Sequence, residues 1–141
     1  MVEIILLDDY VLTEVGNIPI DWSLVKLGDC VKLQTGKRMK GGARQDHGVL
    51  SIGGEHITES GNIRIDIRKY ITEEFYDNLP QGKVQNSDVL MVKDGATTGK
   101  MAYVSDLPIS KMAINEHVFI IRSTQPSMLH NEFLYFILLS E

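Results

Sequence analysis

The segment from Ser87 to Val104 constrains the fold of this chain more than any other. Two apolar runs flank a polar stretch of eight residues from Lys93 to Lys100. Gly95 and Gly99 suit the positive backbone angles of a tight turn. The pattern therefore predicts a β-hairpin. Its tip carries two hydroxyl groups between two lysines, which suits a polar or anionic ligand.

A nucleotide is the first candidate ligand, because the tip has some features of a phosphate-binding loop. That motif requires a glycine, four residues and then Gly-Lys-Ser/Thr at the start of a helix. Here only three residues separate Gly95 from Gly99, and Met101 follows Lys100. The residues after the tip predict a strand, so no helix N-terminus points at a phosphate. Nucleotide hydrolysis is therefore the least favoured function.

Length and composition limit the class of protein that this chain can be. A chain of 141 residues with 43% hydrophobic and 23% charged residues predicts a single soluble domain with its own core. The single cysteine, Cys30, excludes an intramolecular disulfide and fits a reducing compartment. No apolar run is long enough to span a membrane, and no signal peptide is recognised. We therefore expect a cytoplasmic protein.

Catalytic and metal-binding motifs are missing from the sequence. The four histidines, at positions 47, 56, 117 and 130, have no partner at zinc-ligand spacing. Glu55-His56 and Glu116-His117 are adjacent pairs, and because neighbours in a strand point to opposite faces, we do not expect either pair to form an acid-base dyad by itself. No nucleophile elbow is present. The sequence predicts no catalytic residue, no metal and no cofactor.

The hydrophobic periodicity predicts an α+β fold, a mixed and strand-rich single domain with short helices. Thr72 is a predicted N-cap, since glutamates follow it in the first turn. The C-terminal helix is apolar nearly all round and needs burial on several sides. The expected elements are a turn at 16–19, strands at 23–26, 49–52, 63–66 and 116–122, helical turns at 27–33, a polar loop at 34–48 and helices at 72–79 and 127–141.

The distribution of charge along the chain is compatible with an anionic partner. The net charge of −5 argues against a general nucleic-acid binder. However, the first 21 residues hold five acids and no Lys or Arg, and the remaining residues hold fourteen charges of each sign. The stretch from Lys37 to Arg44 has four cations and no acid. It is either a phosphate-binding loop or a solvated loop without a ligand.

DNA recognition needs cations for phosphates beside amides and hydroxyls for base edges. The predicted phosphate contacts are Lys37, Arg38, Lys40, Arg44, Lys93 and Lys100. The predicted base-reading residues are Gln45, His47, Thr97 and Thr98, and Gln34, Thr35 and Asn115 are further polar candidates. The alternative is that the two threonines only cap their turn and that Asn115 satisfies a strand end.

Three segments in this order resemble the target recognition domain of type I restriction-modification specificity subunits. Gly16 to Trp22 with Lys26 to Asp29 is similar to the opening segment of such domains. Asn86 to Lys100 is similar to the family's hairpin. Asn115 to Arg122, followed by Phe133 to Ser140, resembles the late strand and the start of the helix that leads into the conserved spacer.

The resemblance implies a non-catalytic specificity component that reads one half of a bipartite site on double-stranded DNA. Its partners would be modification subunits, which use S-adenosylmethionine to methylate adenine, and restriction subunits, which translocate and cleave DNA. S-adenosylmethionine and ATP are expected only on those partner subunits. The implied division is a lead-in segment at 1–15, a target recognition domain at 16–126 and the start of a spacer helix at 127–141, leading toward a coiled coil.

The chain holds one recognition domain and only the beginning of a spacer helix, so we expect a fragment or a half-subunit. A second hypothesis is a non-catalytic protein-interaction module that docks through its apolar C-terminal helix. Self-association through the same helix is a related prediction. In that reading, the basic loop at 37–44 has no ligand.

Overall fold

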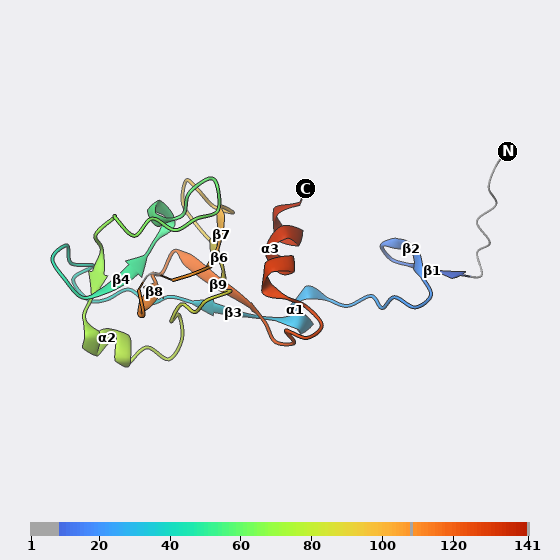
Figure 1. The fold of residues 1–141 in the computed structure, drawn as a ribbon, viewed down its shortest axis with the longest axis horizontal. Helices are drawn as coiled ribbons and strands as arrows, with labels where there is room; N and C mark the ends of the chain where they lie inside the picture. Colours follow the sequence, from blue (N-terminus) through green and yellow to red (C-terminus); the bar gives the residue numbers. More distant parts are fainter. Residues whose placement is uncertain (1–8, 108, 141) are drawn as a thin grey trace.

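The computed structural model describes residues 9–107 and 109–140 and shows two main sheets, a separate two-stranded sheet and short helices (Figure 1). The first sheet is antiparallel, with strand order β3-β9-β6-β7, and the second has the order β5-β4-β8. The first comprises β3 (Val31–Thr35), β9 (Val118–Ser123), β6 (Val89–Val92) and β7 (Met101–Tyr103). The second comprises β5 (Tyr70–Ile71), β4 (Val49–Ile52) and β8 (Met112–Ile114). The helices are α1 (Leu27–Cys30), α2 (Glu73–Asp77), α3 (Asn131–Leu139) and the 3-10 turn η2 (Gly54–His56).

Strand β6, inside the four-stranded sheet, is covered on both faces. On one face, Leu90 and Val92 of β6 join Ile52 and Ile114 from the second sheet in one core cluster. On the other face, Val89 packs with Leu134 and Tyr135 of α3. Successive strand residues point to opposite faces, so β6 needs apolar residues at every position. This is why Val-Leu-Met-Val reads as a continuous apolar run.

Strand register brings four strand ends to one end of the domain. The ends of β3 and β6 both lie beside the start of β9, because Thr35 pairs with Phe119 and Val92 with Val118. β4 and β8 are parallel and finish together, since Ile52 pairs with Ile114. We call this end of the domain, where β3, β4, β6 and β8 finish, the loop end. The loops that follow these strands are therefore neighbours in space.

A buried ion pair joins β6 to β9 at the other end of these strands. The carboxylate of Asp88 has a relative exposure of 1%. Arg122 donates to it from Nε at 2.7 Å and from a terminal nitrogen at 2.8 Å. The backbone N–H of Gln85 adds a third bond at 2.8 Å. Every donor that the carboxylate needs is thus supplied inside the fold.

Several sequence predictions are confirmed. The hairpin forms, with β6 and β7 paired antiparallel around the 93–100 tip. The strand at 49–52 is β4, and the predicted strand at 116–122 is β9, which begins two residues later. Thr72 caps α2, accepting a hydrogen bond from the N–H of Phe75 at 3.1 Å. The α+β, strand-rich architecture is as expected.

Other predictions are wrong. Residues 16–19 form strand β2 (Gly16–Pro19), which pairs with β1 (Tyr10–Thr13) and is not a turn. Residues 23–26 and 63–66 form no strand, the latter making a single bridge between Ile57 and Ile63. The helical turns end at Cys30, since β9 pairs with the chain from Val31 onward. At 16–19 and from Val31 onward, a pairing strand decided the outcome.

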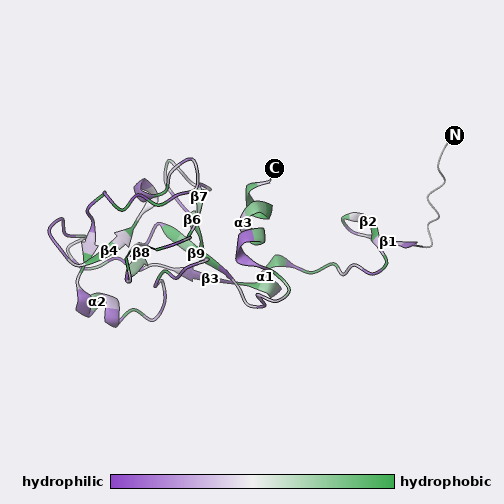
Figure 2. Ribbon diagram, viewed as in Figure 1, coloured by the Kyte–Doolittle hydropathy of each residue, from purple (hydrophilic) through white to green (hydrophobic). Residues whose placement is uncertain are grey.

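The β1–β2 hairpin lies apart from the two sheets, joined by an extended segment (Figure 1). Its apolar side chains and those of the following segment are exposed, and part of the chain is coloured hydrophobic there and along α3 (Figure 2). On α3, which starts four residues later than predicted, Phe133 and Phe136 are 61% and 58% exposed. Among the described residues no helix is long and apolar enough to cross a bilayer.

Candidate nucleic-acid interface

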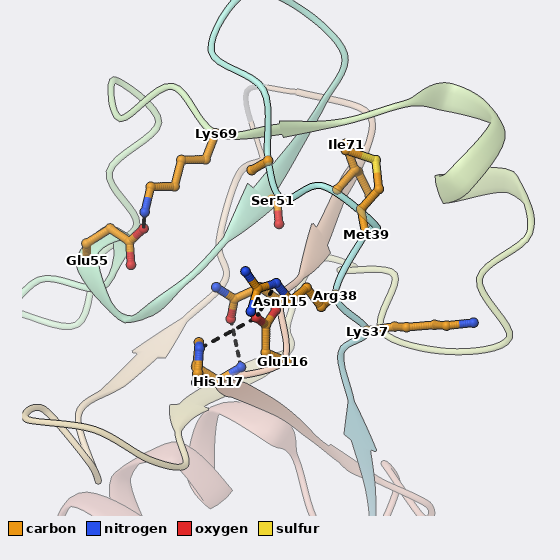
Figure 3. Close-up of a pocket in the computed structure, with 12 residues that line it drawn as sticks. Lys37, Arg38, Met39, Ser51, Glu55, Lys69, Ile71, Asn115, Glu116 and His117 are labelled. Carbon is orange, nitrogen blue, oxygen red and sulfur yellow. Dashed lines mark hydrogen bonds and ion pairs between the residues drawn. The ribbon is translucent and has the colours of Figure 1, made fainter.

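Four segments surround a cleft at the loop end. They are the 36–48 loop after β3, β4 with the 53–56 turn that follows it, the 69–71 segment and the 115–117 turn between β8 and β9. The cleft has a volume of about 260 Å³, and Figure 3 shows ten of its residues labelled. Its polar and charged lining side chains are Lys37, Arg38, Ser51, Glu55, Lys69, Asn115, Glu116 and His117.

Two glycines permit the close approach of these segments. A Cβ at Gly36 would collide with the carbonyl oxygens of Ile114 and Asn115. A Cβ at Gly53 would lie 2.6 Å from Asn115 Nδ2 and 2.6 Å from Glu55 Oε2. Gly36 requires glycine for space rather than for a positive φ, since the atoms that a Cβ would meet are backbone, whereas at Gly53 the side chains of Asn115 and Glu55 would have to shift.

The 115–117 turn is held by its own side chains. Asn115 Oδ1 accepts a hydrogen bond from the N–H of His117 at 2.9 Å. His117 Nδ1 lies 2.5 Å from Asp94 Oδ1, and the His117 carbonyl accepts from the N–H of Lys93 at 2.9 Å. The hairpin tip and the turn are therefore tied together as one surface.

The charges of the cleft alternate in sign. Lys69 forms an ion pair with Glu55, while Arg38 Nε lies 3.8 Å from Glu116 Oε1. Burial is the largest single effect and pushes the pKa of Glu55 upward, but the hydrogen bond from Lys69, a backbone hydrogen bond and the charge of Lys69 together leave that pKa below its ordinary value. Figure 3 shows Arg38 beside Glu116 and the Lys37 side chain directed away from the 115–117 turn.

A buried histidine supports the 53–56 turn from beneath. The side chain of His56 has no exposed surface. Its Nδ1 accepts from the N–H of Gly53 at 3.0 Å, so its Nε2 carries the proton and donates to the Ile67 carbonyl at 3.0 Å. Burial lowers the pKa of His56, an effect only partly opposed by the Ile67 carbonyl and by Glu55. The ring is therefore neutral in the folded protein.

We expect stability to fall in acid because of His56. Its pKa is lowered on folding, so the unfolded state binds a proton first. The contribution is complete above the ordinary histidine value of about 6.5 and is lost as the pH falls below it. The slope should approach about 1.4 kcal/mol per pH unit. Urea unfolding at pH 7.5, 6.5 and 5.5 measures it, and a His56 ring that titrates at 6.5 or above in NMR spectra would contradict the assignment.

The predicted phosphate-binding residues are divided between two depressions and the hairpin. Lys37 and Arg38 line the cleft. Lys40 and Arg44 border a second depression, of about 560 Å³, beside the start of α2, and Lys37 and Arg38 line this depression too. At the ends of the hairpin tip, Lys93 and Lys100 are half-buried, and Lys93 Nζ lies 5.6 Å from the centre of the Phe119 ring.

The predicted base-reading residues differ in position. Thr97 lies beside the cleft turn, its Oγ1 3.2 Å from where a Cβ on Gly54 would be. Thr98 donates its hydroxyl to the Gly95 carbonyl at 2.8 Å, which is the turn-capping alternative. Gln45 and His47 are exposed in the 36–48 loop, and neither is among the residues that line the cleft. The structure thus brings Thr97 close to the cleft residues and leaves Gln45 and His47 outside them.

Sequence reasoning missed five polar residues that line the cleft: Ser51, Glu55, Lys69, Glu116 and His117. Neither Glu-His pair lies in a strand, since η2 holds one and the 115–117 turn holds the other. In the turn, His117 Nε2 lies 3.6 Å from Glu116 Oε1. Gly53-Gly54 before the first pair and Asn115 before the second are turn signals that point to these loops. Nothing local in the sequence indicates Lys69.

The arrangement suits binding rather than metal chemistry. Within the described ranges, no group of three or more His, Cys, Asp or Glu side chains is placed to hold a metal ion. The cleft instead combines cations, carboxylates and an amide on supports that are fixed by strand ends. Such a surface can hold a polyanion and read polar groups along it.

Comparisons with known proteins agree on one family. Residues 19–141 match the family model described as the type I restriction modification DNA specificity domain. The chain is 25% identical over 135 residues to the type I restriction enzyme MjaVIII specificity subunit of Methanocaldococcus jannaschii. That alignment covers 92% of this chain and 30% of the relative, so the chain spans less than a third of that protein.

Solved structures show the same fold. The HsdS subunit from Thermoanaerobacter tengcongensis superposes with a TM-score of 0.64 at 15% identity, over 94% of this chain and 30% of that one. A chain from a study of complex assembly and conformational transition of the type I R-M system gives 0.63 at 17% identity, over 87% and 28%. Since the family model covers most of the sequence, this chain belongs to the type I restriction modification DNA specificity domain family.

Proposed function

We propose that this domain recognises double-stranded DNA and reads one half of a bipartite site as the specificity component of a type I restriction-modification complex. The observation that supports this most is the loop end, where four segments distant in sequence place cations, carboxylates, an amide and a hydroxyl around one cleft. The family match supports the same ligand. In this proposal the chain binds DNA and performs no catalysis.

The cations would contact phosphates from three directions. Lys37 and Arg38 approach from the start of the 36–48 loop, Lys40 and Arg44 from its far side, and Lys93 and Lys100 from the hairpin. The nearby polar side chains, Thr97 and Asn115 among them, would face base edges. Cations that surround polar groups fix the register in which the bases are read.

The partners of the whole assembly follow from the family and are part of the proposal. Modification and restriction subunits would hold S-adenosylmethionine and ATP and carry out the reactions, in the cytoplasm. Residues 1–15 would be a lead-in, residues 16–126 the recognition domain and residues 127–141 the start of the spacer helix. The exposed apolar face of α3 suits a helix-packing role beside DNA binding. The family match favours DNA recognition over a module that only docks proteins.

Selection from a pool of randomised duplexes tests the proposal directly. The chain is mixed with the pool at moderate salt, bound duplexes are recovered and sequenced, and one enriched duplex is compared with a scrambled one by fluorescence anisotropy. We expect enrichment of a short motif and tighter binding of the enriched duplex. Equal binding of the two duplexes at every salt concentration would refute sequence-specific recognition.

Lys100→Gln should weaken binding to all duplexes by the same factor, because a phosphate contact carries no sequence information. One lost contact should reduce the slope of log K against log salt concentration by about 0.9. Fluorescence anisotropy at salt concentrations between about 50 and 200 mM measures the binding constants that give this slope. Lys26→Gln is the matched control, because Lys26 lies beside α1 at the opposite end of β3. An unchanged slope in the Lys100 variant would remove this lysine from the interface.

A further inference from the structure

The carboxylates of the cleft differ in how their oxygens are used. Glu55 is paired with Lys69, and Asp94, at the hairpin tip, lies within hydrogen-bond distance of His117. Glu116 is different. Its nearest cationic atoms are Arg38 Nε at 3.8 Å and His117 Nε2 at 3.6 Å, and no hydrogen bond to its carboxylate occurs in the part of the chain that the structure describes. Its acceptor capacity is therefore free.

Ion pairing does not explain why the Glu116 carboxylate lies in the cleft. Arg38 is 75% exposed at its side chain, and an exposed pair at such a distance contributes little to stability. The Glu116 side chain is only 31% exposed and lines the cleft between Arg38 and His117. A negative charge there also opposes phosphate binding, so it costs general affinity for DNA. A group that lowers affinity and keeps free acceptors suits discrimination between bases.

On the basis of the proposed function, we infer that Glu116 is a base-reading residue that accepts a hydrogen bond from the N4 amino group of a cytosine in the major groove. An ionised carboxylate can only accept. Guanine presents two acceptors in the major groove, thymine an acceptor and a methyl group, and adenine an acceptor beside its amino group. Cytosine alone presents a donor without a neighbouring acceptor.

The supports of Glu116 suit this role. Asn115 closes the turn through the N–H of His117, and the N–H of Asn115 donates to the Ile52 carbonyl at 2.8 Å, so the backbone is anchored on both sides. His117 is tied in turn to Asp94 of the hairpin tip. A base-reading side chain needs such a rigid support, because hydrogen-bond geometry decides discrimination.

Glu116→Gln tests the inference, since glutamine keeps the size and changes the hydrogen-bonding pattern. A glutamine amide can both donate to adenine N7 and accept from adenine N6. The randomised pool is selected in parallel with the parent chain and with the variant. We expect the parent to enrich cytosine at one position and the variant to replace it with adenine there, with the other positions unchanged. Discrimination at that position should change by about ten-fold.

A second signature separates this role from a structural one. Removal of the negative charge in Glu116→Gln should tighten binding to a scrambled duplex, while the preference for cytosine at the one position falls. Glu132→Gln makes the same charge change at the start of α3, away from the loop end, and should leave both the enriched motif and the preference unchanged. Thermal melts of the variants confirm that each is folded.

The outcomes are distinguishable. If the parent enriches a motif and Glu116→Gln enriches the same motif with the same cytosine preference, the inference is overturned and DNA recognition stands. A loss of preference at every position in a folded variant would also overturn it, in favour of a general role for the turn. If the parent enriches no motif, the proposed function itself fails for this chain, and the inference fails with it.

Discussion

Asp88→Asn is expected to lower the free energy of unfolding by about 3 kcal/mol, because it leaves Arg122 with an uncompensated charge between β6 and β9. The carboxylate is almost fully buried and accepts two hydrogen bonds from Arg122 and one from Gln85. Arg122 is 26% exposed, so water relieves part of the cost and the loss lies at the lower end of the range for buried pairs.

Urea denaturation followed by far-UV circular dichroism measures this loss. Asp66→Asn is the matched control, because Asp66 also binds an arginine, Arg64, at 2.7 Å but lies at the surface. We expect the control to change the free energy of unfolding little, since solvent screens an exposed pair. Equal effects of the two substitutions would show that burial does not determine the contribution of the Asp88 pair.

A double variant separates the ion pair from the lost packing. The double variant Asp88→Asn with Arg122→Gln has no unpaired charge at this position. It should therefore be more stable than Asp88→Asn alone. A double variant that loses the sum of the two single losses would mean that the residues are not coupled, although their atoms are 2.7 Å apart.

Gly36→Ala is expected to have the second large effect, and to act on the site as well as on stability. The added Cβ would collide with the carbonyl oxygens of Ile114 and Asn115, which are backbone atoms held in strand β8 and its turn. Neither can rotate away, so the 36–48 loop must move. Such overpacking typically costs about 1–3 kcal/mol. It should also separate Lys37 and Arg38 from Glu116 and weaken DNA discrimination.

Gly28→Ala is the control for this substitution. Gly28 lies in α1, has no left-handed backbone angle, and would place its Cβ in open space. Alanine favours a helix over glycine, so this variant should be as stable as the parent or slightly more stable. Urea denaturation compares stability, and anisotropy with an enriched duplex compares binding. If Gly36→Ala behaves like Gly28→Ala on both measures, the contact between the loop and the 115–117 turn does not hold the site.

Local sequence signals were sufficient where the determinants of structure lie close together in the chain. The hairpin around Gly95 and Gly99, the cap at Thr72 and the buried strand at 49–52 each depend on a few adjacent residues, and all three are present. The predictions failed where a distant partner decides. Gly16-Asn17-Ile18-Pro19 has turn composition but forms a strand because β1 pairs with it.

The same division holds at the site. The cations at 37–44 and at 93 and 100 could be recognised as candidates from composition alone. Their grouping could not, because Gln45 and His47 belong to the same loop as Lys37 and Arg38 yet do not line the cleft. Lys69 had no distinctive local pattern and Glu116 had only the turn signal of Asn115, and both reach the cleft through the pairing of β4 with β5 and with β8.

By itself, the amino-acid sequence determined the α+β class, the hairpin, the capped helix and the family, since these depend on alternation, turn residues and segment order along the chain. Only the tertiary structure decided which side chains share the loop end. The physical reason is strand register: β3, β4, β6 and β8 finish together because each is hydrogen-bonded to a partner distant in sequence. That convergence places Arg38, Glu55, Lys69 and Glu116 around one cleft.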